Sequence, residues 1–90
     1  MRTRKVIKRI EKVNIPSGWE RHVDDWESLP AYWSEFPGFS GEILFDEFNN
    51  SYIFNSSAIQ IGTRNIRDYN ALLSGLKFYR ELNRALRGHK

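Results

Sequence analysis

The sequence predicts a single small α+β domain, in which an antiparallel β-sheet of about three strands is packed by one long C-terminal helix, with a short aromatic helix in the middle of the chain. Three patterns lead to this fold class. They are a helical apolar repeat over residues 66–86, β-branched and aromatic residues over residues 42–61, and a short aromatic run over residues 29–36. A chain of 90 residues buries enough surface for one modest core, so we expect residues 1–90 to form one domain.

The C-terminal helix is predicted from its ends and its apolar repeat. Thr63 or Asn65 can cap its N-terminus, and Gly88 follows the last periodic residue. The apolar residues that recur at intervals of three and four are Ile66, Tyr69, Leu72, Leu73, Leu76, Tyr79, Leu82 and Leu86. Because the repeat averages about 3.3 residues per turn, below the helical value, the apolar stripe drifts by on the order of 100° along the helix. We therefore expect the helix either to cross the sheet obliquely or to bend near Ser74-Gly75.

The sheet is predicted from three short runs of strand-forming residues. Glu42–Phe48 and Tyr52–Asn55 form a hairpin across Asn49-Asn50-Ser51, since asparagine tolerates the positive φ that tight turns need. Ala58–Ile61, after a break at Ser56-Ser57, is the expected third strand. The apolar residues in these runs predict a sheet with one buried face.

The N-terminal segment, residues 3–15, fits two kinds of structure. Val6, Ile10 and Val13 match one face of a helix. The β-branched residues and the turn signal that follows at Pro16-Ser17-Gly18 fit a strand equally well. We expect a strand, because these residue types favour extended structure and the helical period is imperfect.

A short helix is expected over Leu29–Phe36. Ser28 is a suitable N-cap, Pro30 stands in the first turn, where its missing N–H costs no hydrogen bond, and Pro37-Gly38 ends the element. The aromatic residues of this segment recur at three and four positions and form one apolar face, which predicts packing against the core.

Charge is distributed unevenly along the chain. Residues 1–12 carry six basic side chains and one acidic one, residues 13–62 carry one basic and eight acidic ones, and residues 63–90 carry seven basic and two acidic ones. Two interpretations follow. Either the basic ends neutralise the acidic middle within the fold, or they fold onto one side and form a positive face.

The second interpretation predicts a nucleic-acid interface. On the C-terminal helix, cations at spacings of three and four residues fall within about 80° of arc and form one basic stripe. Such a stripe neutralises phosphates without reading base sequence. The expected nucleic-acid-binding residues, from both ends of the chain, are Arg2, Arg4, Lys5, Lys8, Arg9, Arg64, Arg67, Lys77, Arg80, Arg84 and Arg87. The competing interpretation is an ordinary solvated helix face, with cations near the negative C-terminal end of the helix.

A protein-binding role is the alternative function. The middle of the chain combines aromatic and acidic residues, so that a protein partner would meet large apolar anchors beside carboxylates. The residues assigned to this interface are Trp19, Asp24, Asp25, Trp26, Glu27 and Trp33. Core packing is the simpler role for most of the rings. For the first function we expect a small accessory or regulatory factor whose partner is a nucleic acid or a nucleoprotein complex. For the alternative we expect an inhibitor or accessory factor, of a viral or mobile-element type, whose partner is a host protein.

Catalysis has little support in the sequence. His22 lies two residues from Asp24, but no motif places a nucleophile beside it. Asp24, Asp25, Asp46 and Glu47 match no metal-binding spacing, and the sequence has no phosphate-binding glycine motif. We therefore expect a non-catalytic protein that uses no metal and no cofactor.

The composition also bears on location. The chain has no cysteine, which excludes disulfides, thiolate zinc sites and thiol nucleophiles. No run approaches the roughly 18 apolar residues that cross a membrane. We expect a cytoplasmic, intracellular protein that does not bind membranes, with a flexible basic arm at residues 1–5 and a frayed tail at residues 88–90. Its oligomeric state stays open, and a homodimer is one of the alternatives.

Overall fold

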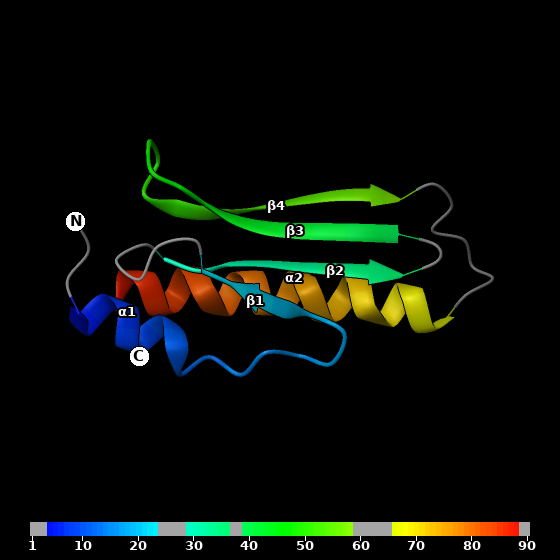
Figure 1. Cartoon of the computed structure of the whole chain (residues 1–90), viewed down its shortest axis with the longest axis horizontal. Helices are drawn as coiled ribbons and strands as arrows, with labels where there is room; N and C mark the ends of the chain where they lie inside the picture. Colours follow the sequence, from blue (N-terminus) through cyan, green and yellow to red (C-terminus); the bar gives the residue numbers. More distant parts are fainter. Residues whose placement is uncertain (1–3, 24–28, 37–38, 59–65, 89–90) are drawn as a thin grey trace.

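The computed structural model describes residues 4–23, 29–36, 39–58 and 66–88, and it confirms the α+β class (Figure 1). The sheet has four strands, one more than expected, and a long and a short helix accompany it. In chain order the elements are α1 (Arg4–Glu11), β1 (Glu20–His22), β2 (Ala31–Phe36), β3 (Phe39–Asp46), β4 (Ser51–Ala58) and α2 (Ile66–Arg87).

The four strands form an antiparallel meander in the order β1-β2-β3-β4. In the β3–β4 hairpin, Asn50 has a φ of 52°, which confirms the expectation that an asparagine adopts the left-handed conformation there. Strand β4 continues through Ser56-Ser57 to Ala58, so the break expected at the two serines is wrong. The remainder of the expected third strand, residues 59–61, lies outside the described residues.

The aromatic helix expected over Leu29–Phe36 is wrong, because residues 31–36 form strand β2. The same residues also alternate with a period of two: Tyr32 and Ser34 are buried while Trp33 and Glu35 are exposed. Pairing with β1 on one side and β3 on the other satisfies the strand backbone, and this tertiary pairing outweighs the local helix signals.

The strand expected at the N-terminus is also wrong, because residues 4–11 form helix α1. Ile10 is fully buried, and Val6 and Val13 pack against the same core cluster, so the helical interpretation of their spacing is the correct one. The Arg9 guanidinium donates hydrogen bonds to the carbonyl oxygens of Ala85 (2.8 Å) and Leu86 (3.3 Å). These bonds satisfy orphan carbonyls at the C-terminus of α2 and fix α1 beside it.

Helix α2 begins and ends close to the predicted positions. It ends at Arg87 and is followed by Gly88, whose φ is 77° and whose N–H donates to the Ala85 carbonyl at 3.1 Å. Its buried face differs from the predicted stripe. The most buried apolar positions of α2 are Ala71, Gly75, Phe78, Leu82 and Leu86. Two members of the predicted stripe, Tyr69 and Leu73, are exposed instead.

Gly75 is a packing position, and its role is to admit the ring of Trp19. A Cβ at Gly75 would overlap the Trp19 indole and lie 3.1 Å from the Phe54 ring. The Trp19 and Phe54 ring centroids are 5.9 Å apart. On the face of the sheet toward α2, the register places the small residues Ser34 and Gly41 opposite each other, which leaves room for these rings.

The core lies between α2 and one face of the sheet, which we call the inner face. Tyr32 contacts Phe78 edge-on, with centroids 4.8 Å apart. At the β4 edge of the sheet, the Tyr52 N–H donates to Asn83 Oδ1 (2.7 Å), and Asn83 Nδ2 donates to the Tyr52 carbonyl (3.2 Å). The Tyr52 hydroxyl donates to the Pro30 carbonyl at 2.9 Å. Both polar ends of Tyr52 are therefore satisfied within the core.

Candidate nucleic-acid interface

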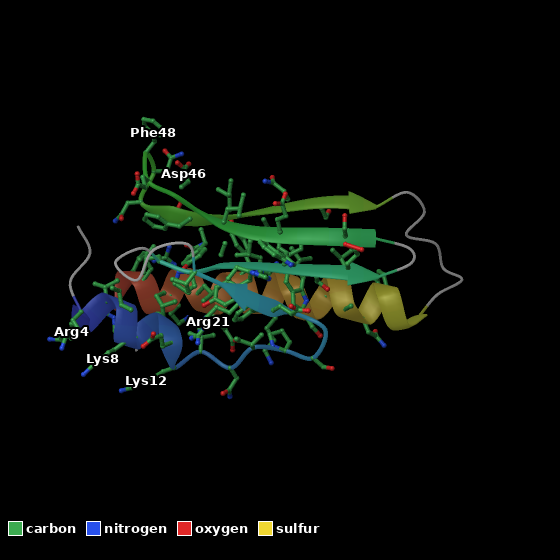
Figure 2. The ribbon with its side chains drawn as sticks, viewed as in Figure 1. Arg4, Lys8, Lys12, Arg21, Asp46 and Phe48 are labelled. Atoms are coloured by element: carbon green, nitrogen blue, oxygen red, sulfur yellow. The ribbon has the colours of Figure 1, made fainter. Side chains whose placement is uncertain are left out.

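The cations of α1 lie mostly on one exposed face of that helix. At 100° per residue, Arg4, Lys5 and Lys8, together with Lys12 in the turn that directly follows α1, fall within about 100° of arc, opposite the side that carries the buried Ile10. Figure 2 shows Arg4, Lys8 and Lys12 pointing away from the rest of the molecule. Four exposed cations thus share one surface, whereas Arg9, turned toward α2, serves a structural role.

The cations of α2 lie on the side of that helix opposite the core. On a helical wheel, the buried positions of α2 lie along one line, and the centre of the basic stripe lies about 180° from that line. All four side chains are exposed: Lys77, Arg80, Arg84 and Arg87. The stripe therefore faces away from the sheet.

The two basic surfaces meet where α1 packs beside the C-terminal half of α2. A groove of about 330 Å³ runs between the helices, lined by Lys12, Val13, Asn14, Glu81, Arg84 and Ala85. Lys12 from the first segment and Arg84 from the second thus line the same groove, although 72 positions separate them in the sequence. We call the exposed cations of α1 and α2, with the groove between them, the basic helix layer.

Arg21 extends this layer onto the sheet edge. The register pairs it with Tyr32, which places it on the inner side of β1, near the end of α1. Burial raises the pKa of Tyr32 to about 12, against a smaller lowering by the Arg21 charge. Lys12 and Arg21 were not among the predicted site residues. The spacing of Lys12, four residues after Lys8 and eight after Arg4, was a signal that a helical interpretation of this segment would have used.

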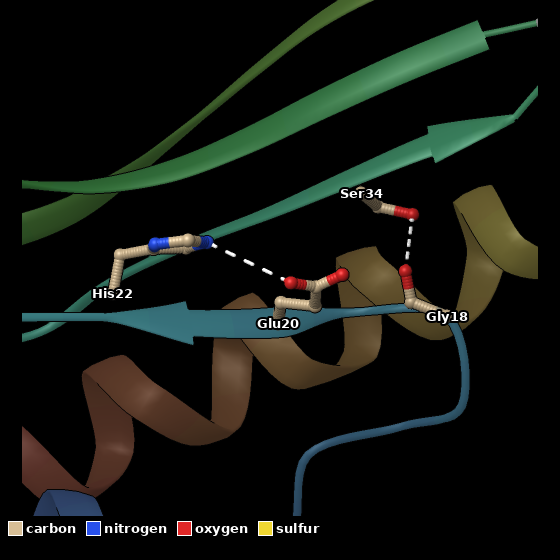
Figure 3. Close-up of polar contacts among 4 residues, drawn as sticks. All are labelled: Gly18, Glu20, His22 and Ser34. Atoms are coloured by element: carbon tan, nitrogen blue, oxygen red, sulfur yellow. Dashed lines mark hydrogen bonds and ion pairs between the residues drawn. The ribbon is translucent and has the colours of Figure 1, made fainter.

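Carboxylates within the described part of the chain do not neutralise these cations. The one contact of this kind found there lies between His22 Nε2 and Glu20 Oε1 at 3.9 Å, and it is an ion pair only when the imidazole is protonated (Figure 3). No lysine or arginine of that part lies within ion-pairing distance of a carboxylate. Of the predicted cations, Arg2 and Arg64 lie outside the described residues, as does the side chain of Arg67.

The opposite, outer face of the sheet is acidic. The register places Glu20, Trp33, Glu42 and Asn55 in one row across the four strands. Glu35 and Asp46 lie on the same face, because side chains alternate along each strand. No lysine or arginine of the described strands lies on it. The carboxylates of the described strands therefore lie on the face away from the helices, whereas Glu11 and Glu81 lie among the cations of the basic helix layer.

Of the residues that the sequence assigned to a protein interface, only some are exposed in the structure. Trp19 is 5 % exposed and its ring is packed on Gly75, so it is a core residue and not an exposed anchor. Trp33 is 42 % exposed on the outer face, and its ring is stacked on His22 with centroids 3.2 Å apart. The remaining members of the set lie outside the described residues: Asp24, Asp25, Trp26 and Glu27.

Two of the groups considered for catalysis, His22 and Asp46, contact neighbouring groups in the structure, although the buried His22 Nε2 makes no hydrogen bond among the described residues. His22 contacts Glu20 and Trp33. Asp46 binds its own turn, since its carboxylate accepts hydrogen bonds from the Phe48 N–H (3.0 Å) and from Asn49 Nδ2 (2.6 Å). Across the ranges that the structure describes, no group of three or more potential metal ligands is found.

Within those same ranges, neither helix has the length and apolar character needed to cross a membrane. Comparisons with protein-family models, curated proteins and solved structures gave no significant match. The assignment of function therefore depends on the geometry of the two charged faces.

Proposed function

We propose that this protein binds nucleic acid, free or within a nucleoprotein complex, through the basic helix layer. One observation carries the proposal: Lys12 and Arg84, from opposite ends of the sequence, line one groove between two helices whose exposed cations form no ion pair with a carboxylate in the described part of the chain. Lysine and arginine side chains in this arrangement suit the evenly spaced phosphates of a nucleic-acid backbone.

The proposed contacts are electrostatic and independent of base sequence. Each phosphate that a cation neutralises releases condensed counterions, so affinity falls steeply with salt concentration. Four to six such contacts would give a logarithmic salt slope of roughly −4 to −5 on duplex DNA. The acidic outer face of the sheet repels phosphates and so orients the protein with its helices toward the ligand.

The test is a fluorescence-anisotropy titration of labelled duplex and single-stranded DNA and RNA at several salt concentrations. We expect Kd values in roughly the micromolar range at low salt, which weaken as salt is added. The double variant Arg80→Gln with Arg84→Gln should weaken binding and reduce the slope on duplex DNA by about two.

A matched control separates local contacts from net charge. Asn50→Asp with Asn55→Asp also lowers the net charge by two, but at exposed positions in the sheet and its hairpin turn. This control should bind almost as the parent protein does. Equal losses in both double variants, or binding that does not respond to salt, would contradict a role for the basic helix layer.

The second candidate function is protein binding, and the exposed aromatic rings of the acidic regions favour it. Trp33 is exposed in a row with Glu20 and Glu42, and Phe48 is fully exposed at the tip of the β3–β4 hairpin (Figure 2). Rings beside carboxylates suit a partner with apolar and basic residues. Trp33→Ala and Phe48→Ala should each release such a partner in a pull-down, while binding to nucleic acid is unchanged. Retention of the partner by both variants would exclude this surface.

A further inference from the structure

Strand β4 forms one edge of the sheet, and its open backbone groups have a definite direction. Both backbone groups of Tyr52 bind Asn83, so they point away from the neighbouring strand β3. This orientation repeats every second residue in an antiparallel strand. The N–H and C=O groups of Phe54, Ser56 and Ala58 therefore also point outward from the edge. Within the described part of the chain, no hydrogen bond reaches these groups of Phe54 and Ser56.

The composition of β4 does not protect this edge against pairing. Edge strands in natural proteins are commonly short, charged or interrupted by proline. Strand β1, at the other edge, has three residues and carries Glu20 and Arg21. Strand β4 has eight residues, none of which is charged or proline, and Asn83 covers it only at Tyr52.

Beside this open edge, helix α2 presents apolar side chains that the core does not fully bury. On the helical wheel, Leu72, Leu76 and Tyr69 lie within about 40° of Asn83, the residue that reaches the β4 edge. Leu72 and Leu76 are partly buried, and Tyr69 is 45 % exposed. These three residues belong to the predicted apolar stripe of α2 but lie to one side of its core-facing line.

Along the direction of strand β4, these apolar side chains lie level with the residues whose backbone groups are open. Strand β4 and helix α2 run in opposite directions, and Asn83 marks where they meet at Tyr52 (Figure 1). From Tyr52 to Ala58 the strand advances about 20 Å, a distance that about 13 residues of helix cover. Counting back from Asn83 leads to about residue 70, so the apolar side chains flank the open part of the edge.

We propose that the β4 edge pairs with the β4 edge of a second copy of this chain, antiparallel about a twofold axis. Pairing over residues 54–58 centres on Ser56, places Ser56 opposite its own counterpart, and forms about six backbone hydrogen bonds. The absence of charge in β4 favours a second copy as the occupant, because a twofold axis sets identical residues against each other and a charged edge would repel itself.

The resulting dimer has a continuous sheet of eight strands, four from each copy. Its twofold axis is perpendicular to the sheet, so the α2 helices of both copies lie on the same side and bring their Tyr69, Leu72 and Leu76 side chains together. Both basic helix layers then face the same direction. The pairing itself does not depend on nucleic-acid binding.

The first test measures the mass of the protein by sedimentation equilibrium and light scattering from about 1 µM to about 500 µM. We expect a reversible dimer. Ser56→Lys, which places two like charges across the axis, should raise the dimer Kd at least tenfold, and Tyr69→Glu should raise it by a similar factor. Ser40→Lys is the matched control, because it makes the same change at an exposed position on strand β3, inside the sheet, and it should leave the Kd unchanged. Circular dichroism checks that each variant remains folded.

A second test locates the contact. The chain has no cysteine, so Ser56→Cys introduces a single thiol. Facing residues of a hydrogen-bonded antiparallel pair have Cα atoms about 5.5 Å apart, which suits a disulfide. Oxidised Ser56→Cys should form a covalent dimer, and Ser40→Cys should not. A monomer at the highest concentration, a dimer that Ser56→Lys and Tyr69→Glu leave unchanged, or cross-linking of Ser40→Cys without Ser56→Cys would each overturn the proposal.

Discussion

The inner and outer faces of the sheet are built from the same four strands but obey different constraints. The inner face meets α2 through close contacts, among them Trp19 against the backbone of Gly75 and Asn83 against the backbone of Tyr52. The outer face carries exposed glutamates and Trp33, and neither helix of the described part of the chain packs on it. Substitutions on the inner face should therefore change the free energy of unfolding. Substitutions on the outer face should change binding and have little effect on folding.

Asn83→Ala should have the largest effect on stability. The substitution removes the two hydrogen bonds that Asn83 makes with the buried N–H and C=O of Tyr52, and each such loss costs about 1–3 kcal/mol. We expect the free energy of unfolding to fall by about 2–4 kcal/mol in urea titrations. Asn70→Ala, at an exposed position of the same helix, is the control and should change it by less than about 0.5 kcal/mol. Equal effects at both positions would mean that Asn83 does not hold the strand.

Gly75→Ala should destabilise the protein, whereas the same substitution at an exposed glycine of a helix stabilises it. At an open helical site this substitution stabilises by about 1 kcal/mol. At Gly75 the added methyl group would overlap the Trp19 ring, so we expect a loss of about 1–3 kcal/mol in thermal or urea unfolding. Ser74→Ala, one position earlier and exposed, should be neutral or slightly stabilising. A stabilising Gly75→Ala would disprove the close contact with Trp19.

The buried hydroxyl of Tyr32 predicts a loss of stability in alkali. Burial raises the pKa of this group to about 12 in the folded protein, above the value of 10.0 expected when the chain is unfolded. Its contribution is therefore complete below pH 10 and is lost as the pH rises toward 12, at a rate of up to about 1.4 kcal/mol per pH unit. Urea titrations across this range should show the loss, and Tyr32→Phe should lessen it. An unchanged pH profile in Tyr32→Phe would assign the transition to other groups.

Trp33→Ala should have the smallest effect on folding, although it removes a large ring. The Trp33 side chain is 42 % exposed and its contact is with His22 on the surface, so we expect the free energy of unfolding to change by less than about 1 kcal/mol. A loss as large as that of Asn83→Ala would show that the outer face also contributes to the core. Thermal unfolding followed by circular dichroism makes the comparison.

Local sequence signals determined the helix end and the hairpin turn, because these features depend on interactions among residues a few positions apart. Gly88 ends α2 in the left-handed conformation and Asn50 turns the β3–β4 hairpin, because each resolves a backbone requirement at its own position. The arc of the α2 cations also follows from helical geometry alone, once the helix is known. The shared side of Lys77, Arg80, Arg84 and Arg87 was therefore predictable from the sequence.

Tertiary structure decided the features for which two local patterns were both present. Residues 31–36 carry helix signals and a strand alternation together, and pairing on both sides selected the strand. The N-terminal segment became a helix because Ile10 could be buried while Arg9 bound the end of α2. Which face of α2 is buried depended on Trp19 fitting over Gly75, a contact between residues 56 positions apart.

The same distinction applies to the basic helix layer. The sequence by itself determined that both ends of the chain are basic, that the middle is acidic, and that the cations of α2 share one side. Only the folded structure brought α1 and α2 together, so that Lys12 and Arg84 line one groove, with the carboxylates of the strands on the opposite face. The physical reason is that caps and turns depend on adjacent residues, whereas packing depends on the shape of surfaces that meet only in the folded chain.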